Sequence, residues 1–436
     1  MKRLLISLFL LAIFVSACGP AEPIPLPTPA AGMLYVDPSV QRGQISPYVY
    51  GSNTGPAYVV PYEMMPYVLD AGFTVFRFPG GAWGDRNKLQ TYQIDQFMDF
   101  LTQTGGIPTI SVNLRDGTPE QAAELVRYAN IQKGYNIQYW SIGNEPTLYE
   151  AELNETYDTE IFNREWRAFG EAMRAVDPNI KLMGPELHQW GGSLEETLKD
   201  SSGRDWMTEF LKANGDLVDV VTVHRYPLWR NGFEQVTIPE MRANAPQWNG
   251  EIIYLRNLIQ EITGREIPMA FTEVNSNPAA AIGGEATPDS FYNAIWFADV
   301  LGRLISEQVF MVNHWVLSQR STGHSLIKGN EIRPSLYVFY LYKHFGDQLV
   351  YSASGVQNVS VYAATREDGT LTILLINLTD ERQQLPLELQ GDAPAEADLW
   401  LFDATHNAEN LGAQPWPADG VLNLPAQSAS LYVIEK

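Results

Sequence analysis

The sequence predicts an α/β fold in which a (β/α)₈ (TIM) barrel is followed by a C-terminal antiparallel β-sandwich. From about residue 45, short apolar runs alternate with longer amphipathic stretches, which is the pattern of β-α units around a parallel sheet. After about residue 346, strand-like runs follow one another with only turn residues between them. The chain of 436 residues is long enough for such a barrel together with an accessory domain.

The first 18 residues predict a targeting segment. Lys2 and Arg3 precede an apolar run over residues 4–15, which is too short to span a bilayer as a mature helix. Cys18 follows a pair of small residues and is the only cysteine, so no intramolecular disulfide can form. This ending resembles the lipobox of bacterial lipoproteins, whose cysteine is acylated. The resemblance implies an extracytoplasmic lipoprotein of the cell envelope, lipidated at Cys18, and an ordinary signal peptide of a secreted protein is the alternative.

A linker and one strand are expected before the barrel. Residues 19–32 are rich in proline and alanine and have no hydrophobic periodicity, which is typical of a semi-rigid tether. Residues 33–44 are strand-like and are expected to join the sandwich before the chain enters the barrel. We therefore expect the barrel over residues 45–345 and the sandwich over residues 346–436.

Eight apolar runs can be assigned to barrel strands. Helices are expected between them, for example over 118–130 and 288–305, each opened by a threonine followed by proline. A doubly wound open sheet is the alternative, but no glycine-rich phosphate loop follows the first run. The predicted barrel strands are 48–53, 74–79, 108–113, 137–144, 181–185, 218–224, 268–273 and 309–315. The predicted sandwich strands include 359–365, 371–377, 397–402 and 430–434.

Composition narrows the classes of partner. The formal net charge of −22 argues against nucleic acid and against anionic membrane surfaces, so membrane contact is expected only through a lipid anchor. The 11 tryptophans and 21 tyrosines suit stacking on sugar rings, although they serve equally as core. The six histidines show no tight metal-ligand spacing, and the chain has no Gly-x-Ser-x-Gly nucleophile motif. We expect no metal and no other cofactor.

Two glutamates stand at the ends of apolar strands. Glu145 ends the fourth run between Asn144 and Pro146, and Glu273 ends the seventh. The carboxyl ends of barrel strands meet at one rim, where barrel enzymes carry their chemistry. Cleavage of a glycosidic bond with retention needs one carboxylic acid and one nucleophilic carboxylate about 5–5.5 Å apart. One such glutamate is as readily a cap or an ion-pair partner, but the pair predicts a glycoside hydrolase acting on a carbohydrate.

Further polar and aromatic residues lie near the same strand ends. Arg77 could keep the nucleophile ionised, and His224 and Tyr226 share one face of an extended strand and could orient it. Asn144 could bond a sugar hydroxyl and Trp315 could stack on a sugar ring, although a turn and core packing are the structural alternatives. Weaker candidates near strand ends or rim loops are Trp83, Asn113, Glu186, His188, Trp190, Trp229 and His314.

With these residues assembled, the chain resembles the clan of retaining (β/α)₈ glycoside hydrolases known as clan A. In that clan the acid/base ends the fourth strand within an Asn-Glu pair and the nucleophile ends the seventh. The resemblance implies these roles for Glu145 and Glu273. It matches Arg77 to the arginine on the second strand, His224 and Tyr226 to the pair on the sixth, and Trp315 to the tryptophan on the eighth.

Within the clan, the opening segment from Val36 to Gly51, the 78–81 turn and the sandwich resemble α-L-arabinofuranosidases and the neighbouring β-xylosidase and endoglucanase families. The resemblance implies a retaining enzyme that acts on plant-type or microbial polysaccharides or oligosaccharides. Three alternatives remain. Glu186 is the best rival for one catalytic role, the barrel could bind carbohydrate without catalysis, or it could be a lyase or metal hydrolase.

Overall fold

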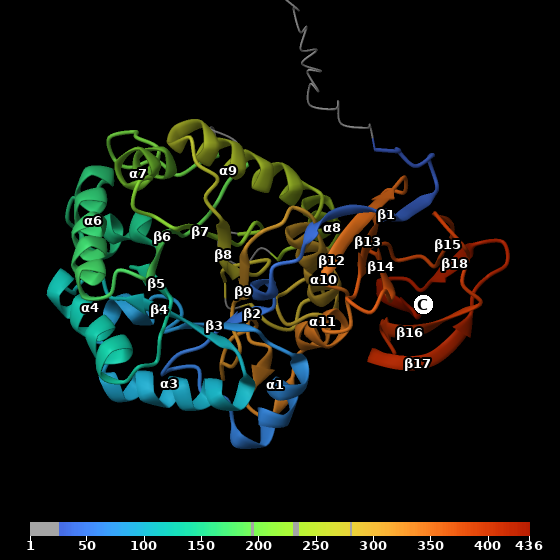
Figure 1. Ribbon diagram of the computed structural model, residues 1–436, viewed down its shortest axis with the longest axis horizontal. Coiled ribbons are helices and arrows are strands. Elements are labelled where there is room, and N and C mark those ends of the chain that lie inside the picture. Colours follow the sequence, from blue (N-terminus) through green and yellow to red (C-terminus); the bar gives the residue numbers. More distant parts are fainter. Residues whose placement is uncertain (1–25, 193–195, 230–234, 280) are drawn as a thin grey trace, which may run out of the picture.

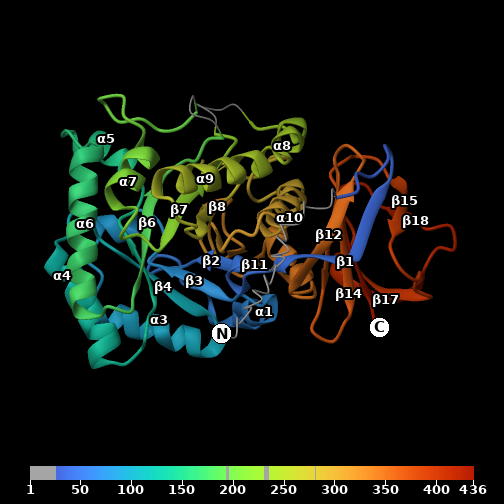
Figure 2. The ribbon, with the colours of Figure 1, turned by 45° about the horizontal axis from the view of Figure 1, so that its top comes forward.

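The computed structural model describes residues 26–192, 196–229, 235–279 and 281–436. It contains two bodies side by side, a barrel of strands ringed by helices and a curled sheet that carries the C-terminus (Figure 1). Helix α10 lies between the two bodies in both views (Figures 1 and 2). No helix among the described residues is long and apolar enough to cross a bilayer. Cys18 and the predicted lipobox lie outside the described residues.

The barrel is closed, and its eight strands run parallel in chain order. This confirms the predicted fold, and each of the eight predicted runs overlaps one strand. The first strand is shorter than predicted because Ser46 and Pro47 start a turn of 3₁₀ helix over Pro47–Val49. The strands are β2 (Gly51–Asn53), β3 (Val75–Phe78), β4 (Ile107–Val112), β5 (Tyr139–Ile142), β6 (Lys181–Leu187), β7 (Val220–Arg225), β8 (Met269–Val274) and β9 (Met311–His314).

Helices surround the barrel, and two of them differ from the predicted bounds. The helix predicted over 118–130 ends as an α-helix at Val126 and continues as a π-helix over Arg127–Gln132. The helix predicted over 288–305 begins later, because the Ser290 hydroxyl accepts a hydrogen bond from the Asn293 N–H at 3.0 Å and so caps the helix. The helices are α1 (Met65–Ala71), α2 (Trp83–Arg86), α3 (Thr91–Thr104), α4 (Pro119–Val126), α5 (Tyr149–Leu153), α6 (Thr159–Val176), α7 (Trp206–Asn214), α8 (Ile238–Asn244), α9 (Gln247–Thr263), α10 (Phe291–Ser306) and α11 (Pro334–Tyr342).

The C-terminal body is one nine-stranded sheet that curls around its own apolar core, in the order β17-β16-β19-β14-β13-β12-β1-β15-β18. Neighbouring strands are antiparallel except β1 and β15, which run parallel. Strand β1, at the start of the folded chain, therefore pairs within the C-terminal sheet, between β12 and β15. The strands are β1 (Leu34–Gln44), β12 (Gln348–Ser354), β13 (Val359–Thr365), β14 (Leu371–Asn377), β15 (Gln383–Leu389), β16 (Glu396–Phe402), β17 (Asn407–Pro415), β18 (Val421–Leu424) and β19 (Ser428–Ile434). A separate hairpin joins β10 (Ile327–Lys328) to β11 (Glu331–Ile332).

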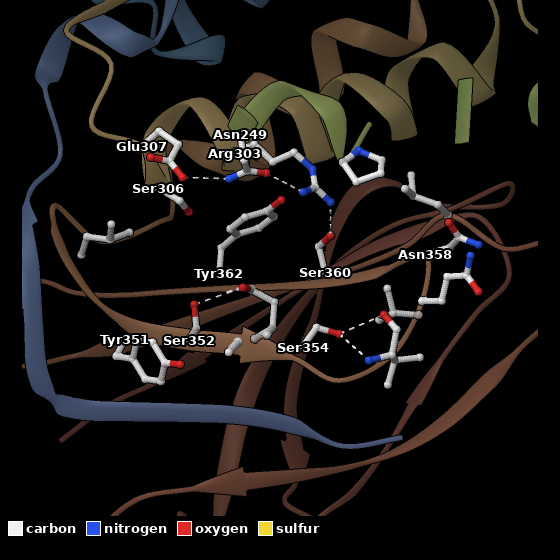
Figure 3. Close-up of a pocket in the computed structure, with 18 of the residues that line it drawn as sticks. Asn249, Arg303, Ser306, Glu307, Tyr351, Ser352, Ser354, Asn358, Ser360 and Tyr362 are labelled. Carbon is white, nitrogen blue, oxygen red and sulfur yellow. Dashed lines mark hydrogen bonds between the residues drawn. The ribbon is translucent and has the colours of Figure 1, made fainter. Parts of the chain in front are cut away.

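A buried polar contact joins the sheet to the barrel. The Tyr362 hydroxyl on β13 donates to Asp299 of α10 at 2.6 Å, and its ring covers Gly302, where a Cβ would lie 2.3 Å from a ring carbon. A cavity of about 690 Å³ opens beside this contact (Figure 3). Arg303 in this cavity donates to Asn249 at 2.7 Å and to Ser360 at 3.1 Å, so its guanidinium is engaged within the interface.

Candidate active site

Five ionisable side chains from five of the eight strands converge at the carboxyl-terminal rim of the barrel. They are Arg77 of β3, Glu145 after β5, Glu186 of β6, His224 of β7 and Glu273 of β8, and we call them the rim cluster. All but Glu145 are almost fully buried. The closed barrel brings the ends of these strands to one rim, and a bulge at Glu186 adds that side chain to the cluster.

Glu273 is held by two donors. Its Oε1 accepts a hydrogen bond from Arg77 Nη1 at 2.8 Å, and its Oε2 accepts one from the Tyr226 hydroxyl at 2.6 Å. Burial raises the pKa of Glu273, while His224, Arg77 and the Tyr226 hydroxyl oppose that rise. The donors thus favour the carboxylate form in a site that water hardly reaches.

Arg77 links Glu273 to the strands beside it. The guanidinium is fully buried and donates to Asn53 at 3.0 Å and to the Asn144 amide oxygen at 2.9 Å. Glu186 lies 3.5 Å from its Nη2. Burial lowers the pKa of Arg77, but Glu186 and Glu273 raise it above its ordinary value, so the group stays charged. One cation therefore holds the nucleophile candidate and the Asn144 side chain in a fixed relation.

Glu145 is the most accessible carboxylate of the rim cluster, with 21% of its side chain exposed. It follows β5 in a left-handed conformation with φ of 51°, which turns the chain into Pro146. Its backbone N–H donates to the Glu186 carbonyl at 3.0 Å, and its Oε1 lies 2.9 Å from His224 Nδ1. Such strained residues persist where surrounding contacts fix them, often in active sites.

The segment before Glu145 rests on a buried carboxylate that the sequence did not single out. Asp85 of α2 accepts a hydrogen bond from the Asn144 N–H at 2.7 Å and another from the Tyr149 hydroxyl. Burial raises the pKa of Asp85 to about 6, against the hydrogen bonds that lower it. Asp85 of α2, itself bonded to Tyr149 of α5, thus fixes the backbone of the Asn144-Glu145 pair.

His224 bridges carboxylates rather than serving Glu273 alone. Its Nδ1 is 2.9 Å from Glu145 Oε1 and 3.6 Å from Glu273 Oε2, and its Nε2 is 2.9 Å from Glu186 Oε2. Of the predicted pair, Tyr226 makes the hydrogen bond to Glu273, whereas His224 Nδ1 stays at 3.6 Å, beyond hydrogen-bond distance, and acts on Glu273 through charge. Burial lowers the pKa of His224, but Glu273 and the hydrogen bonds to Glu145 and Glu186 raise it to about 9.

Glu186 is not a rival for contact with substrate. Its side chain is fully buried, and its oxygens accept hydrogen bonds from the hydroxyls of Ser141 and Thr272, each at 2.5 Å. Burial raises the pKa of Glu186, but Arg77 and His224 bring it down to about 2. It is a fixed anion beneath the rim.

A cation is a poor fit to the rim cluster. One oxygen each of Glu145 and Glu273 and one nitrogen of His224 lie within 4.8 Å of one another, which is a spacing that metal ligands can have. However, these atoms already have partners: His224 Nδ1 lies 2.9 Å from Glu145 Oε1, and Arg77 Nη1 donates to Glu273 Oε1 at 2.8 Å. A metal would have to replace both contacts and compete with the buried cation Arg77.

Aromatic rings border the rim cluster. Trp315 follows β9 and meets Tyr58 edge to face, with ring centroids 5.4 Å apart. A Cβ on Gly81 would lie 2.3 Å from the Trp315 ring, so the glycine turn over 78–81 provides the room for that ring. Tyr58 lies in the loop after β2, where the sequence shows no periodic pattern that could have indicated it.

The weaker candidates lie in several environments. Trp190 and His314 are buried, and desolvation lowers the pKa of His314 to about 3, which is typical of a neutral core histidine. Asn113 accepts a hydrogen bond from the Asp116 N–H at 2.8 Å and stabilises a loop turn. His188 lies 2.6 Å from the Thr147 hydroxyl. Trp83 begins α2, and Trp229 is more than half exposed.

Comparisons with known proteins agree with this geometry. Residues 357–426 match the family model of the D-apionate lactonase C-terminal immunoglobulin-like domain. The chain is 24% identical to mouse (Mus musculus) heparanase over 395 residues, covering 80% of this chain and 70% of that protein. It is 22% identical to α-L-arabinofuranosidase C of Emericella nidulans over 420 residues, covering 81% and 79%.

Solved structures show the same fold. The α-L-arabinofuranosidase of Thermotoga maritima, in complex with arabinose, superimposes with a TM-score of 0.74 at 17% identity, covering 93% of this chain and all of that one. These comparisons confirm the resemblance to the (β/α)₈ glycoside hydrolases of clan A and the barrel with its accessory β domain.

Proposed function

We propose that the protein is a retaining glycoside hydrolase in which Glu273 is the nucleophile and Glu145 the general acid/base. One observation carries this proposal: an oxygen of Glu145 and an oxygen of Glu273 lie within 4.8 Å of each other. Retaining enzymes hold their carboxyl groups about 5–5.5 Å apart, whereas inverting enzymes need about 6.5–9.5 Å to admit a water molecule. The short separation supports direct attack by a carboxylate.

In the first step, a Glu273 oxygen forms a bond to the anomeric carbon as the bond to the leaving oxygen breaks. Glu145 donates its proton to that oxygen, so the alcohol leaves neutral and Glu145 becomes a carboxylate. In the second step, Glu145 takes a proton from water, the water oxygen attacks the anomeric carbon, and the Glu273 carboxylate is released. The sugar is freed with its original anomeric configuration.

Two further contacts would position the sugar. Arg77 fixes the Asn144 amide oxygen, so the amide nitrogen is the atom that would donate to the hydroxyl beside the anomeric carbon. Trp315 and Tyr58 would offer ring surface to the sugar. We infer plant-type or microbial polysaccharides or their oligosaccharides as the substrate class, in keeping with an arabinofuranosidase among the relatives.

The test is a screen of aryl glycosides and polysaccharides, followed by NMR of the first product formed. We expect turnover of at least one substrate, with retention at the anomeric carbon. Inversion would contradict the assignment of Glu273 as nucleophile. Binding of oligosaccharides without any turnover would instead indicate an inactive carbohydrate-binding barrel.

Removing the charge of Arg77 is expected to weaken catalysis and to shift its pH dependence. Arg77 stabilises ionised Glu273, so Arg77→Gln raises the pKa of that nucleophile and moves the acidic limb of kcat/KM to higher pH. We expect kcat to fall about 100-fold, the size of effect seen when a charge-stabilising donor is lost. Both are read from pH–rate profiles.

The matched control for Arg77→Gln is Arg225→Gln, which removes another buried arginine paired with a glutamate, Glu251, outside the rim cluster. Arg225→Gln should lower the melting temperature without moving the acidic limb. A folded Arg77→Gln enzyme with near-normal kcat and an unmoved limb would reduce Arg77 to a structural ion pair.

We also propose that the protein is anchored outside the cytoplasm through acylated Cys18, on the basis of the lipobox-like residues before it. Cys18→Ser should move the protein out of the membrane fraction or stall its processing, and detergent partitioning measures this. Because a single acyl chain binds a bilayer only marginally, stable anchoring implies more than one chain. A wild-type mature protein found wholly in the aqueous phase would instead indicate a secreted enzyme.

A further inference from the structure

Glu186 is the one carboxylate of the rim cluster that the reaction above does not use. It lies in β6 with a left-handed φ of 58°, at a bulge in the pairing of β6 with β7, and the bulge directs its side chain inward. Its side chain is fully buried, and hydroxyls of Ser141 and Thr272 hold its two oxygens. A role for Glu186 must therefore act through a neighbour rather than on the substrate.

That neighbour is His224. Its Nε2 lies 2.9 Å from Glu186, while its Nδ1 lies 2.9 Å from Glu145 and 3.6 Å from Glu273. One ring nitrogen thus faces the fixed anion, and the other faces both carboxylates of the proposed reaction. A neutral imidazole carries a proton on only one nitrogen, whereas an imidazolium can donate on both sides.

We propose that Glu186 is a positioning residue that keeps His224 as an imidazolium, whose Nδ1–H stabilises whichever of Glu145 and Glu273 is the anion at each stage of the reaction. This inference rests on the proposed function, because it assigns negative charge to Glu273 in the free enzyme and to Glu145 in the covalent intermediate.

Charge balance in the buried site supports this role. In the proposed reaction Glu145 carries the proton to be donated, so the anions before attack are Glu186 and Glu273, and the cations are Arg77 and His224. In the covalent intermediate Glu273 is an ester and Glu145 is ionised, so two anions again face the same two cations. If His224 lost its proton, each stage would leave one uncompensated negative charge in a site shielded from water, which is costly.

The charged groups that face His224 from the surrounding elements also favour its protonated form. Glu186 favours the protonated form of His224 at both stages, and Glu273 or Glu145 does so at the stage in which it is ionised, while the cation Arg77 of β3 holds Glu186 and Glu273 in place. His188, in the loop after β6, also faces His224, and burial lowers the pKa of His188, so it stays neutral. Tyr226 donates to Glu273 and stays a neutral phenol because burial raises its pKa well above the ordinary value.

The decisive variant is Glu186→Gln, which keeps the shape of the side chain and one acceptor oxygen but removes its charge and replaces the other oxygen with an NH2 donor. With ¹⁵N-labelled histidine, NMR of the wild-type protein should show His224 protonated up to about pH 9. In Glu186→Gln the titration of His224 should move to lower pH, because the anion at Nε2 is lost and burial then opposes the charge more strongly, while Glu145 and Glu273 still face Nδ1. The His224→Asn protein assigns the signal.

Activity should follow that titration. At pH 8 we expect kcat/KM of Glu186→Gln to fall about 10- to 100-fold, with partial recovery toward pH 6, where His224 regains its proton. Glu186→Asp retains the charge and should keep His224 protonated at pH 8. Glu251→Gln, which removes a buried carboxylate paired with Arg225, should lower the melting temperature and leave the His224 titration unchanged.

An unmoved His224 titration in Glu186→Gln would overturn the proposal, and so would equal losses of activity in Glu186→Asp and Glu186→Gln despite different titrations. The NMR measurement needs no substrate. A wild-type protein that cleaves no glycoside would contradict the proposed function while the His224 titration could still be read, so the two failures are distinguishable.

Discussion

Replacing Glu273 with alanine is expected to abolish turnover of every glycoside that the enzyme cleaves, with a loss of roughly 10⁴-fold or more in kcat. Without this carboxylate, no group of the rim cluster can form the covalent bond to the anomeric carbon. Glu145 cannot replace it, because its Oε1 is engaged by His224 and its position suits protonation of the leaving group. The measurement is kcat on an aryl glycoside with a good leaving group.

External azide or formate is expected to restore part of the activity of Glu273→Ala. A small anion can enter the space left by the side chain, next to Arg77 and Tyr226, and attack the sugar from the same side. The product would be a glycosyl azide of inverted configuration. Glu251→Gln is the control for loss of a buried carboxylate, and activity of Glu273→Ala within tenfold of wild type would exclude Glu273 as nucleophile.

Glu145→Ala should instead divide substrates by their leaving groups. The activated leaving groups of aryl glycosides depart without protonation, so the first step with these substrates is spared. Natural glycosides need a protonated leaving oxygen and are expected to lose about 10²- to 10⁴-fold in kcat/KM. The second step also needs Glu145 as a base, so the covalent intermediate should accumulate and appear as a burst of the first product.

Azide should then relieve the slow second step, because it attacks without losing a proton, and it should give a glycosyl azide of retained configuration. Opposite configurations of the azide products from Glu145→Ala and Glu273→Ala would separate the two roles in one set of measurements. If azide had no effect on Glu145→Ala and all substrates lost activity equally, Glu145 would not be the acid/base.

The sequence predicts the barrel well because most of its strands are buried and lie within apolar runs. It also predicts the strand ends that carry the rim residues, since residues that follow parallel strands must meet at one rim. In the sheet, β13 and β14 match the predicted bounds, whereas β12, β15, β17 and β18 are not among the strands named from the sequence; β17 is largely exposed and its sequence is polar. Pro386 similarly conceals β15.

Two features of the rim cluster could not be predicted from the sequence pattern: the direction of the Glu186 side chain and the partners of His224. The bulge at Glu186 turns its side chain inward, and a strict alternation of residues along β6 does not predict that. The partners of His224 come from β5, β6 and β8, and whether its Nδ1 bonds Glu145 or Glu273 depends on distances of 2.9 and 3.6 Å that no sequence pattern contains. One signal was present: Ser141 and Thr272 place hydroxyls inside apolar runs, and a buried hydroxyl needs a partner. That partner is Glu186.

The pairing of β1 has a consequence for the order in which the chain folds during synthesis. Leu34 lies opposite Ser354 and beside Leu387, so β1 leaves the ribosome long before either neighbour exists. At about 5–20 residues per second, this strand waits on the order of tens of seconds with unpaired backbone groups. All eight barrel strands emerge during that wait, so the barrel can close first. The nascent protein then carries an unpaired β1 as an edge open to intermolecular association until β12 is made.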